Sequence, residues 1–298
     1  MKKTLAMMTA AMMVAGALAG CGSSGSTPAA ATEAATTAAA TDAATTEAAT
    51  TEAAGDTAAA AEGTVKTPSG KFTVGFDQEF PPMGFVGDDG QFTGFDLDLA
   101  KEVASRLGLE FVPQPINWDA KDMELDSGNI DCIWNGFTMQ GREDAYTWVG
   151  PYMANNQVFV VTADSDIASK ADLAGKAVEV QKDSSGLAAL QGDAELSASF
   201  GSMTEVADYN TALMDLESGA CDAVCMDSIV AGYQIKSSGK DMKILDDTLA
   251  AEEYGIGFKK GEDELAKAVH DTLMEMKDDG TVAKISNDWF GSDAFTLK

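Results

Sequence analysis

Two segments far apart in this chain of 298 residues share nearly the same pattern. The first is LDSGNIDCI (125–133) and the second is LESGACDAV (216–224). In each, a helix is expected to end at the glycine, which tolerates the left-handed conformation of a helix C-cap, and a buried strand follows. Two such helix–strand units predict two similar α/β lobes that face each other.

The first unit runs from its strand into a polar turn, within the segment GNIDCIWNGFTMQGR (128–142). Asn135, Gly136 and Thr138 place an amide, an unhindered backbone and a hydroxyl at the carboxyl end of the strand, where open α/β sheets bind their ligands. Arg142 follows, and its planar guanidinium can hold a carboxylate with two parallel hydrogen bonds. A surface ion pair is the alternative interpretation of this arginine.

The second unit continues into Asp227, where the first continues into Asn135. A cationic Arg142 in one lobe and an anionic Asp227 in the other match the two charges of an α-amino acid. Asp227 also stands where the N-cap of the next helix is expected, and the two roles are compatible.

Strand and helix patterns alternate along residues 71–298, which predicts a mostly parallel sheet. The chain is expected to pass between the lobes twice, near 156–160 and 246–253, and two passages make a hinge suited to closure around a ligand. Asp96 is expected to cap the helix that begins there. Strands are expected at 71–77, 109–116, 130–133, 155–162, 177–181, 222–226 and 254–258, and helices at 96–107, 118–128, 209–218, 263–277, 282–290 and from Ser184.

The first twenty residues have the pattern of an export signal. Lys2 and Lys3 form a positive end, and the apolar run 5–19 is too short for a permanent membrane span. The end of this run, LAGC (18–21), is similar to a bacterial lipobox, so Cys21 is the expected lipidation site. An ordinary secreted protein with an incidental cysteine is the alternative. Residues 21–66 are rich in Ala and Thr and are expected to form a disordered tether.

The formal net charge of −28 argues against nucleic-acid binding and favours a solubility role. Cys132, Cys221 and Cys225 are expected to be buried thiols, because four residues of extended strand between the last two span roughly 13 Å. Their redox state stays open. His270 is the only histidine and no cysteine pair has zinc spacing, so neither a metal site nor a cofactor is expected.

From about Lys71 to Lys298 the chain resembles the extracellular solute-binding proteins, family 3, of polar amino-acid ABC transporters. The resemblance covers essentially all of the expected folded region. The motifs that carry it are VGFDQEFPPMGF (74–85), GQFTGFDLDLAKEVASRLG (90–108), SGNIDCIWNGFTMQGRED (127–144), SGACDAVCMD (218–227) and YGIGFKKGEDELAKAV (254–269).

The resemblance implies a periplasmic-binding-protein-like fold, with two α/β lobes, a two-stranded hinge and the ligand in the cleft between the lobes. The expected organisation is a signal at 1–20, a lipidated tether at 21–66, a first lobe at 67–156 plus 250–298, and a second lobe at 157–249. The expected partners are a free polar amino acid, the transmembrane subunits of an ABC permease and the cell membrane through a lipid anchor. The protein is expected to act as an extracytoplasmic monomer.

The resemblance also implies roles for individual residues. Arg142 would clamp the ligand carboxylate, although it follows Thr138 by four residues where five are usual in the family. The helix N-terminus at Ser184 and Ser185 would add backbone donors. Asp227 would accept the ligand ammonium. The full set of expected ligand-binding residues is Asp77, Phe80, Trp118, Asn135, Gly136, Phe137, Thr138, Arg142, Ser184, Ser185 and Asp227.

Three functional classes compete on this pattern. A transport receptor is favoured over a ligand sensor or surface adhesin on the same fold. An enzyme related to dehydratases is disfavoured, because general acid–base chemistry needs a poised group in the cleft and His270 lies outside every cleft motif. Which amino acid is bound is left open, as are its affinity, the identity of the permease and whether the host has an outer membrane.

Overall fold

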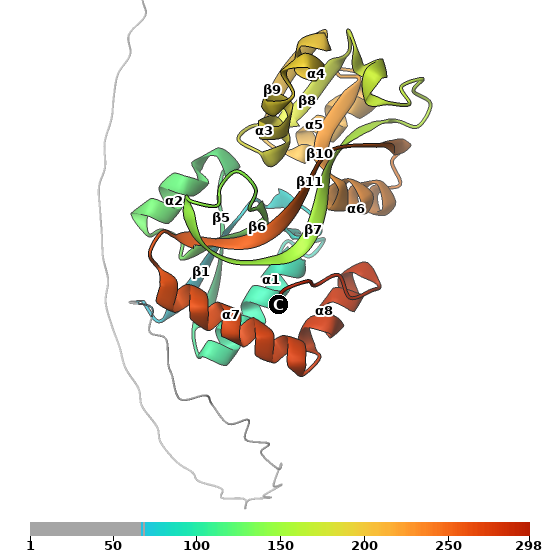
Figure 1. The fold of residues 1–298 in the computed structure, drawn as a ribbon. Coiled ribbons are helices and arrows are strands. Elements are labelled where there is room, and N and C mark those ends of the chain that lie inside the picture. The colour runs from blue at the N-terminus through green and yellow to red at the C-terminus, as the bar shows by residue number, and fades with distance from the viewer. Residues whose placement is uncertain (1–66, 68) are drawn as a thin grey trace, which may run out of the picture. The chain divides into compact units, whose positions relative to one another are not determined.

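The computed structural model describes Thr67 and residues 69–298. The chain divides at residue 57 into two units, and the described residues all belong to the second, Ala58–Lys298. Its main sheet has eight strands (Figure 1). In spatial order they are β5 (Glu110–Pro115), β1 (Lys71–Phe76), β6 (Cys132–Thr138), β11 (Met242–Lys259), β7 (Tyr146–Thr162), β10 (Ala223–Asp227), β8 (Ala177–Gln181) and β9 (Ser202–Val206).

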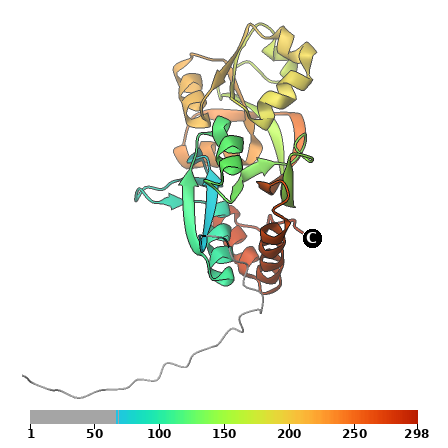
Figure 2. The same ribbon diagram turned by 90° about the vertical axis from the view of Figure 1, so that its left-hand side faces the viewer.

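Helices cover the two ends of this sheet as separate groups, which form two lobes (Figures 1 and 2). A three-stranded antiparallel sheet of β2 (Glu79–Phe80), β3 (Gly84–Val86) and β4 (Phe92–Thr93) belongs to the first lobe. The helices of the first lobe are α1 (Phe95–Leu107), α2 (Lys121–Ser127), α7 (Asp263–Asp278) and α8 (Thr281–Phe290). Those of the second lobe are α3 (Ser185–Gly192), α4 (Ala194–Ser199), α5 (Tyr209–Ser218) and α6 (Ser228–Ser238).

The two expected helix–strand units are present, one in each lobe. Gly128 ends α2 and Gly219 ends α5, both in the left-handed conformation, with φ of 75° and 78°. In that conformation the backbone N–H of each glycine reaches back to the last turn of its helix, which satisfies carbonyls that have no partner within the helix. The strands that follow, β6 and β10, are buried along their whole length.

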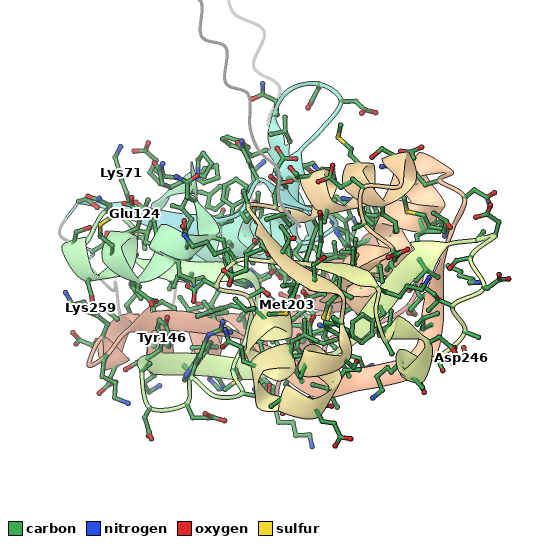
Figure 3. All side chains as sticks on the ribbon, turned by 90° about the horizontal axis from the view of Figure 1, so that it is seen from above. Lys71, Glu124, Tyr146, Met203, Asp246 and Lys259 are labelled. Carbon is green, nitrogen blue, oxygen red and sulfur yellow. The ribbon has the colours of Figure 1, made fainter. Side chains whose placement is uncertain are left out.

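Strands β7 and β11 join the lobes. They pair in antiparallel fashion from Tyr146↔Lys259 in the first lobe to Thr162↔Met242 in the second, with irregular register between Ile244 and Ala250. The labelled Tyr146 and Asp246 lie at opposite ends of the molecule in Figure 3. The sheet is parallel where β1 pairs with β5 and β6 and where β8 pairs with β9 and β10, so the expected parallel arrangement holds at both ends. The expected short strand at 155–162 is the end of a 17-residue strand.

One expected cap is wrong. The helix α1 begins at Phe95 after Gly94, and Asp96 is its second residue and makes no capping bond. Its side chain is fully buried against the sheet, where it accepts hydrogen bonds from the Gly136 N–H and the Tyr152 hydroxyl, both at 2.7 Å. A carboxylate facing the core, and not the helix end, cannot reach the first-turn N–H groups.

The described cysteines, Cys132, Cys221 and Cys225, are free and buried, as expected. Burial raises the pKa of each thiol above its usual range. None of the described helices is long and apolar enough to cross a membrane. Cys21 and the tether lie outside the described residues.

Candidate functional site

A small cavity lies between the lobes, beyond the carboxyl ends of β6, β8 and β10. It shares Thr138, Arg142, Ser184 and Ser185 with a wider cleft of about 820 Å³ on the hinge side. Eight of the eleven residues expected from the sequence line the cavity, and Gln181 joins them. The lining residues are Phe80, Trp118, Gly136, Thr138 and Arg142 from the first lobe, and Gln181, Ser184, Ser185 and Asp227 from the second.

Gly136, which was expected in a turn, lies within β6 close to its carboxyl end. Gly136 has a φ of 58°, and a Cβ atom there would lie 2.9 Å from the Phe80 ring and 3.1 Å from the Tyr254 ring. Asp96 holds this part of β6 in place by accepting the Gly136 N–H, and burial raises the pKa of this carboxyl to about 7. The absence of a side chain at Gly136 therefore makes room for the Phe80 and Tyr254 rings beside the cavity.

Arg142 stands at the mouth of the cavity. Its Nη1 donates to the Thr138 carbonyl at 3.1 Å and its Nη2 to the Asp183 carbonyl at 3.3 Å, while the guanidinium lies 5.0 Å from the centroid of the Phe137 ring. Both of its hydrogen-bond acceptors within the described chain are carbonyl oxygens, so no carboxylate there neutralises its charge. A guanidinium in this position is suited to bind the carboxylate of a ligand with two parallel hydrogen bonds.

The helix α3 points its N-terminus at the same place. Ser184 caps it by accepting the Leu187 N–H at 3.1 Å. Ser185 begins the helix, and its hydroxyl accepts from the Thr138 hydroxyl at 3.2 Å and from Gln157 Nε2 at 3.1 Å. The Thr138–Ser185 bond joins the two lobes at the cavity wall. Backbone N–H groups of a helix N-terminus beside Arg142 reinforce a preference for an anion.

Asp227 is on the second lobe and is 3% exposed. Its carboxylate accepts from the Tyr209 hydroxyl at 2.8 Å, the Tyr254 hydroxyl at 2.7 Å and Asn155 Nδ2 at 2.6 Å. It occupies the N-cap position of α6 but makes no side-chain bond to that helix. Burial, and then the charge of nearby Glu252, raise its pKa above its usual range. These three donors are neutral, so no cation of the described chain pairs with the Asp227 carboxylate.

Aromatic side chains form two further walls. Phe80 is nearly buried and stacks on Tyr209 with the ring centroids 5.7 Å apart. Trp118 is half-buried and packs its edge on Phe137 at 5.5 Å. Flat apolar walls of this kind suit the aliphatic part of a small ligand.

The other three expected residues stand behind the cavity wall. Asp77 accepts from Gln181 Nε2 at 2.7 Å and from the Glu79 N–H at 2.9 Å, and burial raises its pKa to about 6. Asn135 accepts the Asp77 N–H at 3.0 Å, so it holds the backbone at Asp77, directly after β1, in place. Phe137 is fully buried and packs on Tyr146, Trp148 and the cavity residue Trp118, so it supports the wall without lining the cavity.

Several polar residues of the site were not expected from the sequence. Gln181 ends β8, and the rule that found Asn135 and Asp227 at the carboxyl ends of strands could have found it. Asn155, Gln157 and Glu252 lie on the hinge strands β7 and β11. Burial along these strands does not follow a regular alternation and their register is irregular, so the sequence pattern does not indicate which polar residues face the site.

Comparison with known proteins agrees with this geometry. The model of the bacterial extracellular solute-binding proteins, family 3, matches residues 72–292. The L-cystine-binding protein TcyJ of Escherichia coli K12 is 31% identical over 230 residues, which cover 75% of this chain and 84% of TcyJ. The L-cystine-binding protein TcyA of Bacillus subtilis is 32% identical over 228 residues, 75% of this chain and 82% of TcyA.

Solved structures give the same result. An ABC uptake transporter substrate-binding protein from Streptococcus pneumoniae with bound histidine has a TM-score of 0.74 and 34% identity, and the match covers 76% of this chain and 95% of that one. The family expected from the sequence motifs is therefore confirmed. The chain belongs to the bacterial extracellular solute-binding proteins, family 3.

Proposed function

We propose that this protein captures a free polar amino acid outside the cytoplasm and delivers it to the transmembrane subunits of an ABC transporter. One observation carries the proposal: a single cavity presents a guanidinium from the first lobe and a buried carboxylate from the second. These are the complements of the two charges that every α-amino acid has. A ligand that satisfies both must contact both lobes.

In this proposal the ligand carboxylate binds Arg142, with Thr138 and the N-terminus of α3 at Ser184 and Ser185 as further donors. The ammonium binds Asp227, and the side chain extends between Phe80 and Trp118. Asp77 and Gln181 face the distal end, with Asn135, Gly136 and Phe137 shaping the turn that supports it. The relatives are named as binding proteins for L-cystine, histidine and arginine, whose side chains all end in polar groups.

We propose that residues 67–156 and 250–298 move as one body and residues 157–249 as the other, with β7 and β11 as the hinge. Contacts across the cleft support a closed form, since Gln181 reaches Asp77 and Lys182 reaches Asp119 at 2.7 Å each. A ligand that binds the closed form more tightly than the open one shifts the equilibrium toward closure.

The anchor is also a proposal. Residues 1–20 would be removed as a signal, Cys21 would carry lipid, and residues 22–66 would tether a monomeric receptor to the membrane. Binding without catalysis fits the surroundings of His270, the only histidine, which is partly exposed on α7 beside Asp271 and lines neither the cavity nor the cleft.

A thermal-shift screen of residues 58–298 against the twenty amino acids and cystine tests the proposal, with calorimetry of each stabilising compound. Arg142→Ala should weaken binding at least about thirtyfold, because losing one partner of a hydrogen-bonded charge pair costs roughly 2–5 kcal/mol. Arg106→Ala is the matched control, since Arg106 pairs with Glu102 and Asp279 away from the cavity. Affinity of Arg142→Ala equal to that of the control would refute the clamp.

A further inference from the structure

Two carboxylates are buried together where the hinge meets the cavity. Asp227 ends β10 and is 3% exposed, and Glu252 lies on β11 and is 5% exposed. Neither forms an ion pair with a cationic side chain of the described chain. Glu252 also lines the wider cleft, so the pair lies between the cleft and the cavity.

A single amide joins the pair. Asn155 Nδ2 donates to Asp227 Oδ1 and to Glu252 Oε1, both at 2.6 Å. The two carboxylate oxygens therefore lie no more than two hydrogen-bond lengths apart. Gln157 Nε2 donates to the same Glu252 oxygen at 2.9 Å, so Glu252 is held by two amides of β7.

The hydroxyl and thiol groups of the described chain that lie against Asp227 are neutral. Tyr209 on α5 and Tyr254 on β11 donate their hydroxyls to Asp227, and Cys225 is the nearby thiol on β10. Burial raises the pKa of both phenols and of the thiol above their usual ranges, so all three keep their protons at neutral pH. Arg142 lines the same cavity, but it is held at the mouth by the Thr138 and Asp183 carbonyls.

Two buried carboxylates so close to each other cannot both stay ionised without a nearby cation, because burial disfavours each charge and each disfavours the other. Either a proton or a bound cation must compensate one of them. An amino acid brings such a cation, its ammonium, to Asp227. The pair can therefore exchange a bound proton for the ligand ammonium.

We propose that Asp227 and Glu252 share one proton in the ligand-free protein and release it to solvent when the ligand ammonium binds, so that Glu252 is a positioning residue that sets the pH range of amino-acid binding. The proposal rests on the proposed function, because the exchange needs an ammonium at Asp227. Charge balances, since one proton leaves the pair as one positive group arrives.

The sign of the pH effect follows. A ligand that displaces a proton from Asp227 binds less tightly as the pH falls, by about tenfold per pH unit below the pKa of Asp227. Replacing Glu252 with glutamine keeps an oxygen for Asn155 and Gln157 but removes the second charge. Asp227 then ionises at lower pH, and less proton is released on binding at a given pH.

Calorimetry at pH 6.5 in buffers of different ionisation enthalpy measures the released proton directly. The probes are L-cystine and L-arginine, whose α-ammonium groups are charged at this pH. The slope of the binding enthalpy against the buffer enthalpy should give about one proton for the wild type and measurably less for Glu252→Gln, in which burial still raises the pKa of Asp227. The control is Glu253→Gln, the same change at the next residue, which is exposed and should release as many protons as the wild type.

Binding of either probe by the wild type without buffer dependence would overturn the inference, as would equal proton release by Glu252→Gln and the wild type. A melting curve checks that the variant is folded. If it is not, the wild type alone decides, because a dissociation constant that is unchanged from pH 5 to pH 8 also overturns the inference. Failure of both probes to bind would overturn this inference together with the assignment of these ligands, and the amino-acid screen then tests the proposed function separately.

Discussion

Lys121 on α2 reaches across the cleft to the second lobe. Its ammonium donates to a carboxylate oxygen and to the carbonyl of Asp183, the latter at 3.4 Å, and to the Trp118 carbonyl of its own lobe at 3.4 Å. The Lys121 side chain is 2% exposed and that of Asp183 is 52% exposed. Changing Lys121 to methionine keeps an unbranched side chain, one heavy atom shorter, and removes its contacts with Asp183, which can exist only when the lobes are closed.

The expected loss follows from these contacts. A hydrogen bond to a charged group contributes roughly 1.5–3 kcal/mol. Part of this is offset, because burial in the closed form lowers the pKa of Lys121 and methionine has no charge to desolvate. A net cost of about 1–2 kcal/mol to the closed form should weaken ligand binding ~5–30-fold, because the apparent affinity scales with the population of the form that binds.

Titration calorimetry of the wild type and the variant measures this ratio with the same ligand. Lys182→Met is the matched control, since Lys182 also crosses the cleft to an aspartate, Asp119, at 2.7 Å, but the two side chains are 56% and 41% exposed. Exposed ion pairs are screened by water, so the control should lose much less affinity. Equal losses in the two variants, or no loss in Lys121→Met, would refute the argument that the buried contact holds the lobes closed.

Two further predictions concern Asp96 and the anchor. Because burial raises the pKa of Asp96 from 3.8 to about 7, the folded protein holds this proton more tightly than the unfolded chain, and the carboxyl makes the protein less stable as the pH rises through that window. The unfolding free energy of Asp96→Asn, measured by urea titration, should therefore rise relative to that of the wild type as the pH goes from about 4 to about 7. A difference between the two proteins that stays constant over this pH range would contradict the prediction. Cys21→Ser should move the protein from the membrane pellet to the soluble fraction of lysed cells, and retention equal to that of the wild type would contradict lipidation.

Local sequence patterns predicted the helices and strands whose ends are set by interactions between residues close in the sequence. Strand β8 and helix α5 have the predicted bounds, 177–181 and 209–218. Their ends are set by short-range chemistry, such as the Asp208 cap before α5 and the left-handed Gly219 after it. The same holds for Gly136, Thr138 and Asp227, which the pattern placed at the carboxyl ends of strands, whereas the resemblance to the family supplied Phe80 and Trp118.

The remaining features depend on contacts between distant segments. Asp96 stands where a helix cap would be, but the strand that carries Gly136 offers a buried partner instead. Nothing in the sequence distinguishes Glu252 from the many other acidic residues. Its role depends on β7, which places Asn155 and Gln157 against it. Such pairings form only when the lobes pack around the hinge, so no local pattern in the sequence predicts them.

Small-angle X-ray scattering of residues 58–298 tests the central claim most directly, with and without a saturating concentration of the amino acid that binds most tightly. Arg142 and Asp227 lie on different lobes, so a ligand that bridges them should close the cleft and lower the radius of gyration. The Asp227→Asn variant should close less at the same ligand concentration. A radius of gyration that stays unchanged while calorimetry confirms saturation would contradict the account.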